Sequence, residues 1–145
     1  MSDSTQMAGK VVTLWRYPIK SMLGEELNAT EVTTRGLPGD RAYALVDQAT
    51  TNVASAKNPR KWPHLFDFRA AFVVPPRSGM PLPAVRITLP DGRVLTTDQS
   101  EINQLLSTVL QREVTLEAAE RGQQEQAERK SKSLRWIRHT ALRER

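Results

Sequence analysis

The sequence of 145 residues contains no cysteine. This absence excludes disulfides, thiolate metal sites, iron–sulfur clusters and a cysteine nucleophile, whatever the fold. Long apolar runs are also missing: the start, MSDSTQMAGK, is polar, and no later stretch approaches the roughly 20 apolar residues of a membrane span. We therefore expect a cytoplasmic protein. A single domain is expected, large enough to bury about two thirds of the surface that the unfolded chain would expose.

Residue patterns typical of catalysis are scarce. His64 stands in a predicted loop and His139 in the C-terminal tail, and neither has an Asp or Glu at ligand spacing, so no metal site is expected. The serines lack a nucleophile-elbow context, and no glycine pattern matches a phosphate loop or a dinucleotide-binding fingerprint. Nothing indicates that Asp40 and Asp47 face each other, and structural roles in turns are predicted for both. No catalytic residue is predicted.

Positive charge is concentrated at one end of the chain. The formal net charge is +5, but residues 121–145 hold eight Lys/Arg and three Asp/Glu, a net of +5, while residues 1–120 hold thirteen of each. The first 120 residues are therefore neutral overall. The basic tail, which includes Trp136, could bind nucleic acid or an anionic surface. Its apolar residues form no full stripe, so nucleic acid is the less favoured partner and no membrane association is expected.

Short strands with β-branched and aromatic residues dominate the rest of the pattern. Strands are predicted over Val11–Tyr17, within Glu26–Thr34, over Arg41–Asp47 and Val53–Ala56, around Phe66–Val74, and over Val85–Leu89, Arg93–Thr96 and Val114–Glu117. The best-defined pair is the hairpin around Pro90-Asp91-Gly92, where apolar and polar residues alternate before the turn.

One amphipathic helix is predicted at about residues 98–111. Asp98 and Glu101 have the spacing of a capping box, and the apolar residues that recur at helical spacing are Ile102, Leu105, Leu106, Val109 and Leu110. Six or more short strands with one core-facing helix indicate a mainly β fold, either a small β-barrel or a curved sheet with the helix over an open end. The expected boundaries are a flexible lead over residues 1–9, the domain over 10–118, and a basic tail over 119–145 that is a frayed helix or disordered.

Two segments place a cation beside small or hydroxyl residues at the end of a strand. The first is Tyr17-Pro18-Ile19-Lys20-Ser21, and the second is Gly36-Leu37-Pro38-Gly39-Asp40-Arg41. Ammonium, guanidinium, hydroxyl and free backbone N–H groups are the donors that bind a phosphate or carboxylate. The alternative is structural, with Lys20 solvated and Asp40 and Arg41 forming a local ion pair that fixes the loop. Composition alone favours the structural interpretation.

The same two segments carry a family resemblance. YPIKSMLGEEL over residues 17–27, followed by GLPGDRAYALVD over residues 36–47, resembles the N-terminal β-barrel domain of MOSC proteins. That domain usually has a YPVKS-type segment and then a segment with the pattern G-(x)-x-DR-W-x-(L)-V-D, in which parentheses mark optional positions. The resemblance covers residues 10–118, including the loop at Asn58-Pro59. Tyr43 stands where the family commonly has Trp, which keeps a large aromatic side chain with a polar tip.

The resemblance implies a site and a cofactor. In complete MOSC enzymes this domain precedes a MOSC domain, which binds molybdenum cofactor and supplies a cysteine ligand to the metal. The N-terminal domain helps to hold the cofactor's phosphate, and the matching positions here are Lys20, Ser21 and Arg41. No cofactor is expected to bind tightly to this chain alone. Without a cysteine or a MOSC domain, the chain is not expected to be an enzyme on its own.

Three functions follow as alternatives. The first is a stand-alone binding module that contacts the phosphate of a molybdopterin-type ligand, or a partner that carries the MOSC catalytic domain. The second is half of a split molybdenum-cofactor oxidoreductase, active only with such a partner. The third is nucleic-acid binding through the basic tail, which requires an affinity that falls steeply with salt.

Overall fold

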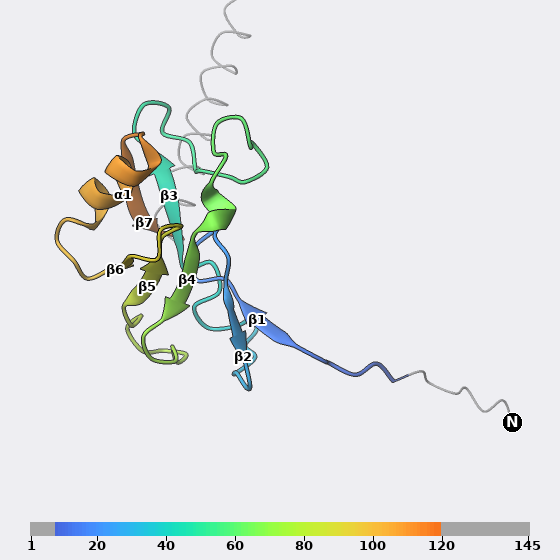
Figure 1. Cartoon of the computed structure of the whole chain (residues 1–145). Helices are drawn as coiled ribbons and strands as arrows, with labels where there is room; N and C mark the ends of the chain where they lie inside the picture. Colours follow the sequence, from blue (N-terminus) through green and yellow to red (C-terminus); the bar gives the residue numbers. More distant parts are fainter. Residues whose placement is uncertain (1–7, 120–145) are drawn as a thin grey trace, which may run out of the picture.

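A computed structural model gives the fold and describes residues 8–119. The described chain is mainly β, as predicted, with seven short strands and one α-helix (Figure 1). In chain order the elements are β1 (Leu14–Arg16), β2 (Glu25–Leu27), β3 (Tyr43–Asp47), the 3₁₀ turn η1 (Leu65–Asp67), β4 (Arg69–Phe72), β5 (Val85–Thr88), β6 (Val94–Thr96), α1 (Ile102–Leu110) and β7 (Val114–Ala118).

The strands form three small antiparallel sheets rather than one closed barrel. The sheets are β1–β2, β3–β7 and β4–β5–β6. Of the two predicted forms, a barrel or an open curved arrangement, residues 8–119 therefore adopt an open one. The strands are three to five residues long. The turns between them contain prolines and residues with a left-handed backbone conformation, neither of which continues a β-ladder.

The segment that follows β1 joins the three sheets. Ile19 forms a parallel bridge with Tyr43 of β3, and Leu23 forms a parallel bridge with Arg69 of β4. Ile19 and Met22 are both buried. The first sequence motif is therefore part of the framework of the fold as well as a candidate binding segment.

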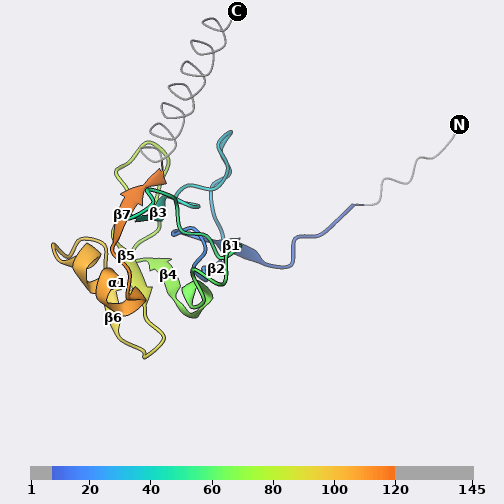
Figure 2. The ribbon, with the colours of Figure 1, turned by 90° about the horizontal axis from the view of Figure 1, so that it is seen from above.

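The helix packs against β7 on the side of the domain away from the β1–β2 hairpin (Figures 1 and 2). Leu106 and Ile102 are its buried residues. Two polar side chains tie it to the strand: the Ser107 hydroxyl accepts a hydrogen bond from Val114 N–H at 3.0 Å, and the side-chain amide oxygen of Asn103 accepts one from Leu116 N–H at 2.8 Å. The helix thus covers the core and also satisfies backbone donors of β7.

The helix starts later than its sequence pattern suggested. Its first residue is Ile102, and the N-cap residue Glu101 makes no side-chain capping bond, so the predicted start at residue 98 and the capping box were wrong. The amide oxygen of Gln99 accepts a hydrogen bond from Thr96 N–H at 2.8 Å, which holds residues 97–101 in a turn. The C-terminus lies close to the prediction, because Gln111 adopts a left-handed conformation with φ 52°.

Four predicted strands are shorter than expected or absent. Of the range Glu26–Thr34, only Glu26 and Leu27 lie in a strand, as part of β2. Only residues 14–16 of Val11–Tyr17 pair, and residues 8–13 extend away from the body as an arm (Figures 1 and 2). In place of the strand predicted over Val53–Ala56 there is one isolated bridge, between Val46 and Val53. Phe66 lies in η1 with its side chain exposed rather than in a strand. Residues 8–13 have strand-forming residues but form no ladder, and the segment at Val53 pairs with β3 only over a short stretch, since Ala54 N–H donates to the Leu45 carbonyl at 2.8 Å. β propensity alone does not make a ladder.

Neither end of the chain belongs to the residues that the structure describes. The predicted lead over residues 1–9 and basic tail over 119–145 fall almost wholly on residues 1–7 and 120–145, which lie outside the described residues. Within residues 8–119, no helix combines the length and the apolar character that crossing a membrane requires.

A buried carboxylate anchors the turn after β3. Asp47 has no exposed surface, and its oxygens accept hydrogen bonds from Ala49 N–H at 3.1 Å and from the Thr50 hydroxyl at 3.1 Å. Lys61 Nζ lies 2.5 Å from Asp47 Oδ2, and Arg112 Nη1 lies 3.4 Å from the same oxygen. The predicted structural role of Asp47 in a turn is therefore confirmed.

We expect the stability of the domain to fall in acid through this group. The hydrogen bond from Lys61 is the main cause that holds the pKa of Asp47 below its ordinary value of 3.8. Its contribution to stability is therefore fully present above 3.8 and is lost as the pH falls through the lower value of the folded state. Urea unfolding between about pH 6 and about pH 3 measures this loss. The profile of Asp47→Asn should be flatter than that of the wild type, and parallel profiles would contradict the assignment.

Candidate functional site

The backbones of the two sequence motifs are hydrogen bonded to each other. Arg41 N–H donates to the Tyr17 carbonyl at 2.6 Å, and Tyr43 N–H donates to the Pro18 carbonyl at 3.0 Å. In the opposite direction, Lys20 N–H donates to the Tyr43 carbonyl at 2.9 Å. These bonds place Tyr17–Ser21 beside the start of β3, which forms a corner between the β1–β2 hairpin and β3. We call residues 17–21 and 40–43 the motif corner.

Asp40 and Arg41 form the local ion pair that the sequence suggested. Arg41 Nη1 lies 2.5 Å from Asp40 Oδ2, and Asp40 Oδ1 accepts a hydrogen bond from Tyr17 N–H at 2.9 Å. The Arg41 guanidinium also lies over the Tyr17 ring, 5.5 Å from its centroid. Its side chain is 61% exposed, and its other N–H groups have no partner within residues 8–119. The arginine is thus oriented by its neighbours and still has donors for a ligand.

Lys20 and Ser21 present two further donors. The Lys20 side chain is exposed and has no hydrogen-bond or ion-pair partner in the described part of the chain. The Ser21 hydroxyl oxygen accepts a hydrogen bond from Ala56 N–H at 3.0 Å, which leaves its own O–H group available to an acceptor. The 51–56 loop therefore fixes the position of the serine oxygen.

Two of these residues have an uncommon backbone conformation. Four non-glycine residues in the described chain have positive φ: Ser21 (69°), Arg41 (51°), Thr51 (60°) and Gln111 (52°). For an L-residue this conformation costs about 1–2 kcal/mol, and it persists where surrounding contacts enforce it. Gln111 ends the helix and Thr51 lies in the turn after β3. The other two, Ser21 and Arg41, are candidate ligand-binding residues, one on each of the two segments of the motif corner.

The structure joins the motifs through backbone contacts and not through the candidate side chains. Lys20, Ser21 and Arg41 share no side-chain partner within residues 8–119. Arg41 lines a hollow between the 33–42 turn and the 76–82 loop, and Lys20 and Ser21 are not among its lining residues. Their assignment as one phosphate site is therefore a prediction that binding has to test.

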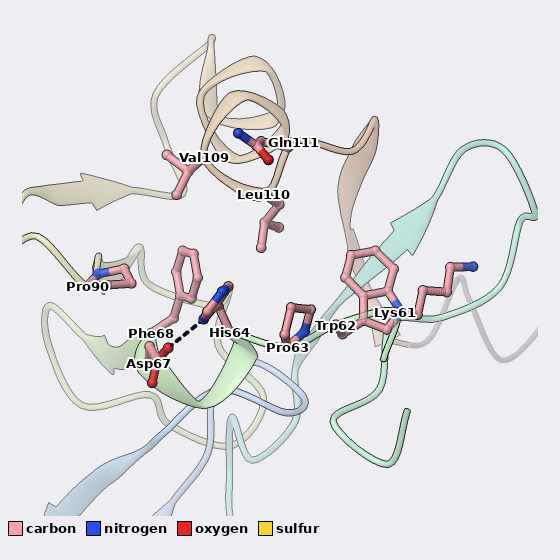
Figure 3. A pocket seen from close by; sticks show the side chains of 10 residues that line it. All are labelled: Lys61, Trp62, Pro63, His64, Asp67, Phe68, Pro90, Val109, Leu110 and Gln111. Carbon is pink, nitrogen blue, oxygen red and sulfur yellow. Dashed lines mark hydrogen bonds and ion pairs between the residues drawn. The ribbon is translucent and has the colours of Figure 1, made fainter. Parts of the chain in front are cut away.

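A mainly apolar hollow of about 430 Å³ lies elsewhere, between η1 and the end of α1 (Figure 3). Its walls include Phe68, Leu110 and His64. His64 Nδ1 lies 3.0 Å from Asp67 Oδ2. The expectation that no carboxylate stands at ligand spacing to His64 was wrong, because the 3₁₀ turn brings Asp67, three residues on, to its ring. No group of three or more His, Cys, Asp or Glu residues that could hold a metal gathers within residues 8–119.

The fold and the motif corner define a class of protein: a mainly β module in which two turns present two cations and a hydroxyl group. A family model described as the MOSC N-terminal beta barrel domain matches residues 8–129. The chain belongs to this family. No curated protein and no solved structure matches it.

Proposed function

We propose that this chain is a non-catalytic MOSC N-terminal module that contacts the phosphate of a molybdopterin-type ligand through Lys20, Ser21 and Arg41. In this proposal a partner protein carries the MOSC catalytic domain and supplies the metal ligand, because this chain has no cysteine. The module binds and orients the anionic end of the ligand, and the partner performs the chemistry.

One observation carries the proposal. The two family motifs are hydrogen bonded across the motif corner, and Ser21 and Arg41 both adopt left-handed conformations there. Glycine would adopt these conformations at lower conformational cost, but it would lose the bond between the Ser21 hydroxyl and Ala56 N–H and the ion pair of Arg41 with Asp40. Serine and arginine at these positions add a hydroxyl and a guanidinium, so the strain is consistent with selection for their side chains.

The donor set fits a phosphate monoester. Lys20 offers a compact ammonium group, Arg41 a planar fork of N–H donors, and Ser21 one O–H group. Charge-assisted hydrogen bonds of this kind are about twice as strong as neutral ones. The nearest carboxylate, Asp40, is already neutralised by Arg41 and by Tyr17 N–H, which limits its repulsion of an anion.

Lys20→Ala and Arg41→Ala should each weaken phosphate-ligand binding by about five- to tenfold and leave the fold unchanged. The expected loss corresponds to one charge-assisted hydrogen bond in an exposed site, about 1–1.5 kcal/mol. The measurement is a two-dimensional NMR titration of the labelled full chain with inorganic phosphate and then with a phosphorylated pterin. The signals to follow are the amides of Lys20, Ser21 and Arg41.

Two matched variants remove the same charges elsewhere. Lys10→Ala deletes an exposed lysine from the N-terminal arm, and Arg86→Ala deletes an exposed arginine from β5. Both should bind like the wild type. Wild-type affinity in both Lys20→Ala and Arg41→Ala would overturn the proposed site, and the motif corner would then be purely part of the framework.

A further inference from the structure

A polar hollow of about 550 Å³ lies beside the motif corner, between the 33–42 turn and the 76–82 loop. Ala118 and Ala119, at the end of β7, complete its lining. Its volume lies in the range of about 300–1,000 Å³ that small-molecule sites occupy. Lys20 and Ser21 do not line it, so it overlaps the phosphate site proposed above only at Arg41. We call it the arginine hollow.

Three arginines and one carboxylate contribute charge to this lining. The arginines are Arg35, Arg41 and Arg77, and the carboxylate is Asp40, so the formal net charge is +3 − 1 = +2. Asp40 is already paired with Arg41. The Arg77 side chain is exposed, and its guanidinium has no partner within residues 8–119. Such a lining favours an anion, because the guanidinium fork matches the oxygens of a phosphate or carboxylate.

Backbone donors add to these cations. Gly39 and Gly79 line the hollow with φ +79° and +74°, and neither N–H group donates to an acceptor within residues 8–119. Turns with left-handed residues commonly present N–H groups to anions. One negative charge lies close to the hollow and partly offsets its positive charge. It belongs to Glu31, whose carboxylate accepts a hydrogen bond from Ser78 N–H at 3.2 Å.

The two walls of the hollow are packed together. A Cβ atom on Gly39 would lie 2.5 Å from the Phe72 ring and 2.8 Å from Pro76, so the turn rests directly on the start of the 76–82 loop. The arrangement is therefore held by contacts that place Arg41 and Arg77 on opposite walls. Leu37, Met80 and Leu82 supply apolar surface in the same lining.

From these observations we propose that the arginine hollow binds a small organic anion, whose phosphate or carboxylate group contacts Arg77. The apolar part of that ligand lies against Leu37, Met80 and Leu82. This site goes beyond the proposed phosphate contact of the motif corner. It shares Arg41 with that contact and is independent of Lys20 and Ser21.

The test is an NMR titration of the labelled full chain with two probes, phenyl phosphate and benzoate. Both carry the same ring and differ in the anionic group. Saturable shifts are expected at the amides of Gly39, Arg77 and Gly79. Arg77→Ala should raise the apparent dissociation constant at least fivefold, and Arg77→Lys should restore part of the affinity. Arg86→Ala, which removes an exposed arginine from β5, is the control and should leave affinity unchanged.

The outcomes separate the two proposals. Tighter binding of phenyl phosphate assigns the hollow to phosphates, and tighter binding of benzoate assigns it to carboxylates. If the saturable shift of the Gly79 amide is lost in Arg77→Ala but kept in Lys20→Ala, the arginine hollow is supported. This holds even if Lys20→Ala and Arg41→Ala show no effect on phosphate binding at the motif corner. Unsaturable shifts with both probes, or equal affinity of Arg77→Ala and wild type, would overturn it. The dispersion of the amide spectrum shows that each variant is folded.

Discussion

Replacing Asp47 with asparagine should lower the free energy of unfolding by about 2–4 kcal/mol, because it removes one partner of a buried ion pair. The carboxylate has no exposed surface, and Lys61, at 22% exposure, would lose its counter-charge. The new amide nitrogen would also place a donor where either Ala49 N–H or the Thr50 hydroxyl now finds an acceptor, because the two groups bind different oxygens of Asp47. Urea unfolding at neutral pH measures the difference.

Asp91→Asn is the matched control. Asp91 also accepts a hydrogen bond from a backbone N–H and pairs with an arginine, since Arg93 N–H and Arg93 Nε lie 2.9 and 2.7 Å from its oxygens. Asp91 is exposed, so in Asp91→Asn water can take the place of the lost interactions. The free energy of unfolding should therefore fall much less than in Asp47→Asn. If Asp47→Asn and Asp91→Asn lowered the free energy of unfolding equally, burial would not increase the contribution of Asp47 to stability.

The second large effect is expected at Gly24, where a side chain has no room. Gly24 is buried just before β2, and an added Cβ would overlap the Arg16 carbonyl oxygen and lie 2.9 Å from Cδ1 of Tyr17. Backbone cannot yield as the end of a flexible side chain can. Gly24→Ala should therefore destabilise the domain by about 2–4 kcal/mol and disturb β1–β2 pairing. Thermal and urea unfolding measure it.

Alanine substitutions at two other glycines distinguish the cost of steric crowding from the cost of an unfavourable backbone conformation. Gly9→Ala meets no atom within 4 Å and has no left-handed φ, so it should change stability little. Gly92→Ala also meets no atom within 4 Å, but its φ of +87° makes any side chain strained, with a cost of about 1–2 kcal/mol. If Gly24→Ala were as mild as Gly9→Ala, the close crossing of the chain over Arg16 would be contradicted.

The Gly24 variant also bears on the motif corner. The Tyr17 ring that the new methyl group would touch is the ring over which the Arg41 guanidinium lies. A small shift of this ring should change the orientation of Arg41 without altering any candidate ligand-binding residue. The framework of the fold and the proposed phosphate contact are thus coupled through one aromatic side chain.

Local sequence determined the features that depend on neighbours in the chain. The β5–β6 hairpin follows from the alternation of apolar residues around Pro90-Asp91-Gly92, and the buried face of α1 follows from its helical spacing. The last strand, predicted over Val114–Glu117, is found as β7. The local ion pair of Asp40 and Arg41 was also foreseeable, because the two residues are adjacent.

Tertiary structure decided the features that need a distant partner. The arm over residues 8–13 has strand-forming residues but stays unpaired, because pairing requires a second backbone alongside it. The capping box failed because the Gln99 side chain, and not that of Asp98, holds the turn before the helix.

The candidate sites divide in the same way. Sequence motifs alone named Lys20, Ser21 and Arg41, through the family to which the chain belongs. The partner of the Ser21 hydroxyl depends on a contact between residues tens of positions apart, and so does the presence of Arg41 and Arg77 in one hollow. The left-handed backbone of Ser21 and Arg41 was likewise not evident from the motifs. Residue type and spacing specify donors and local turns, but only the packed chain decides which donors share a hollow and which are already satisfied.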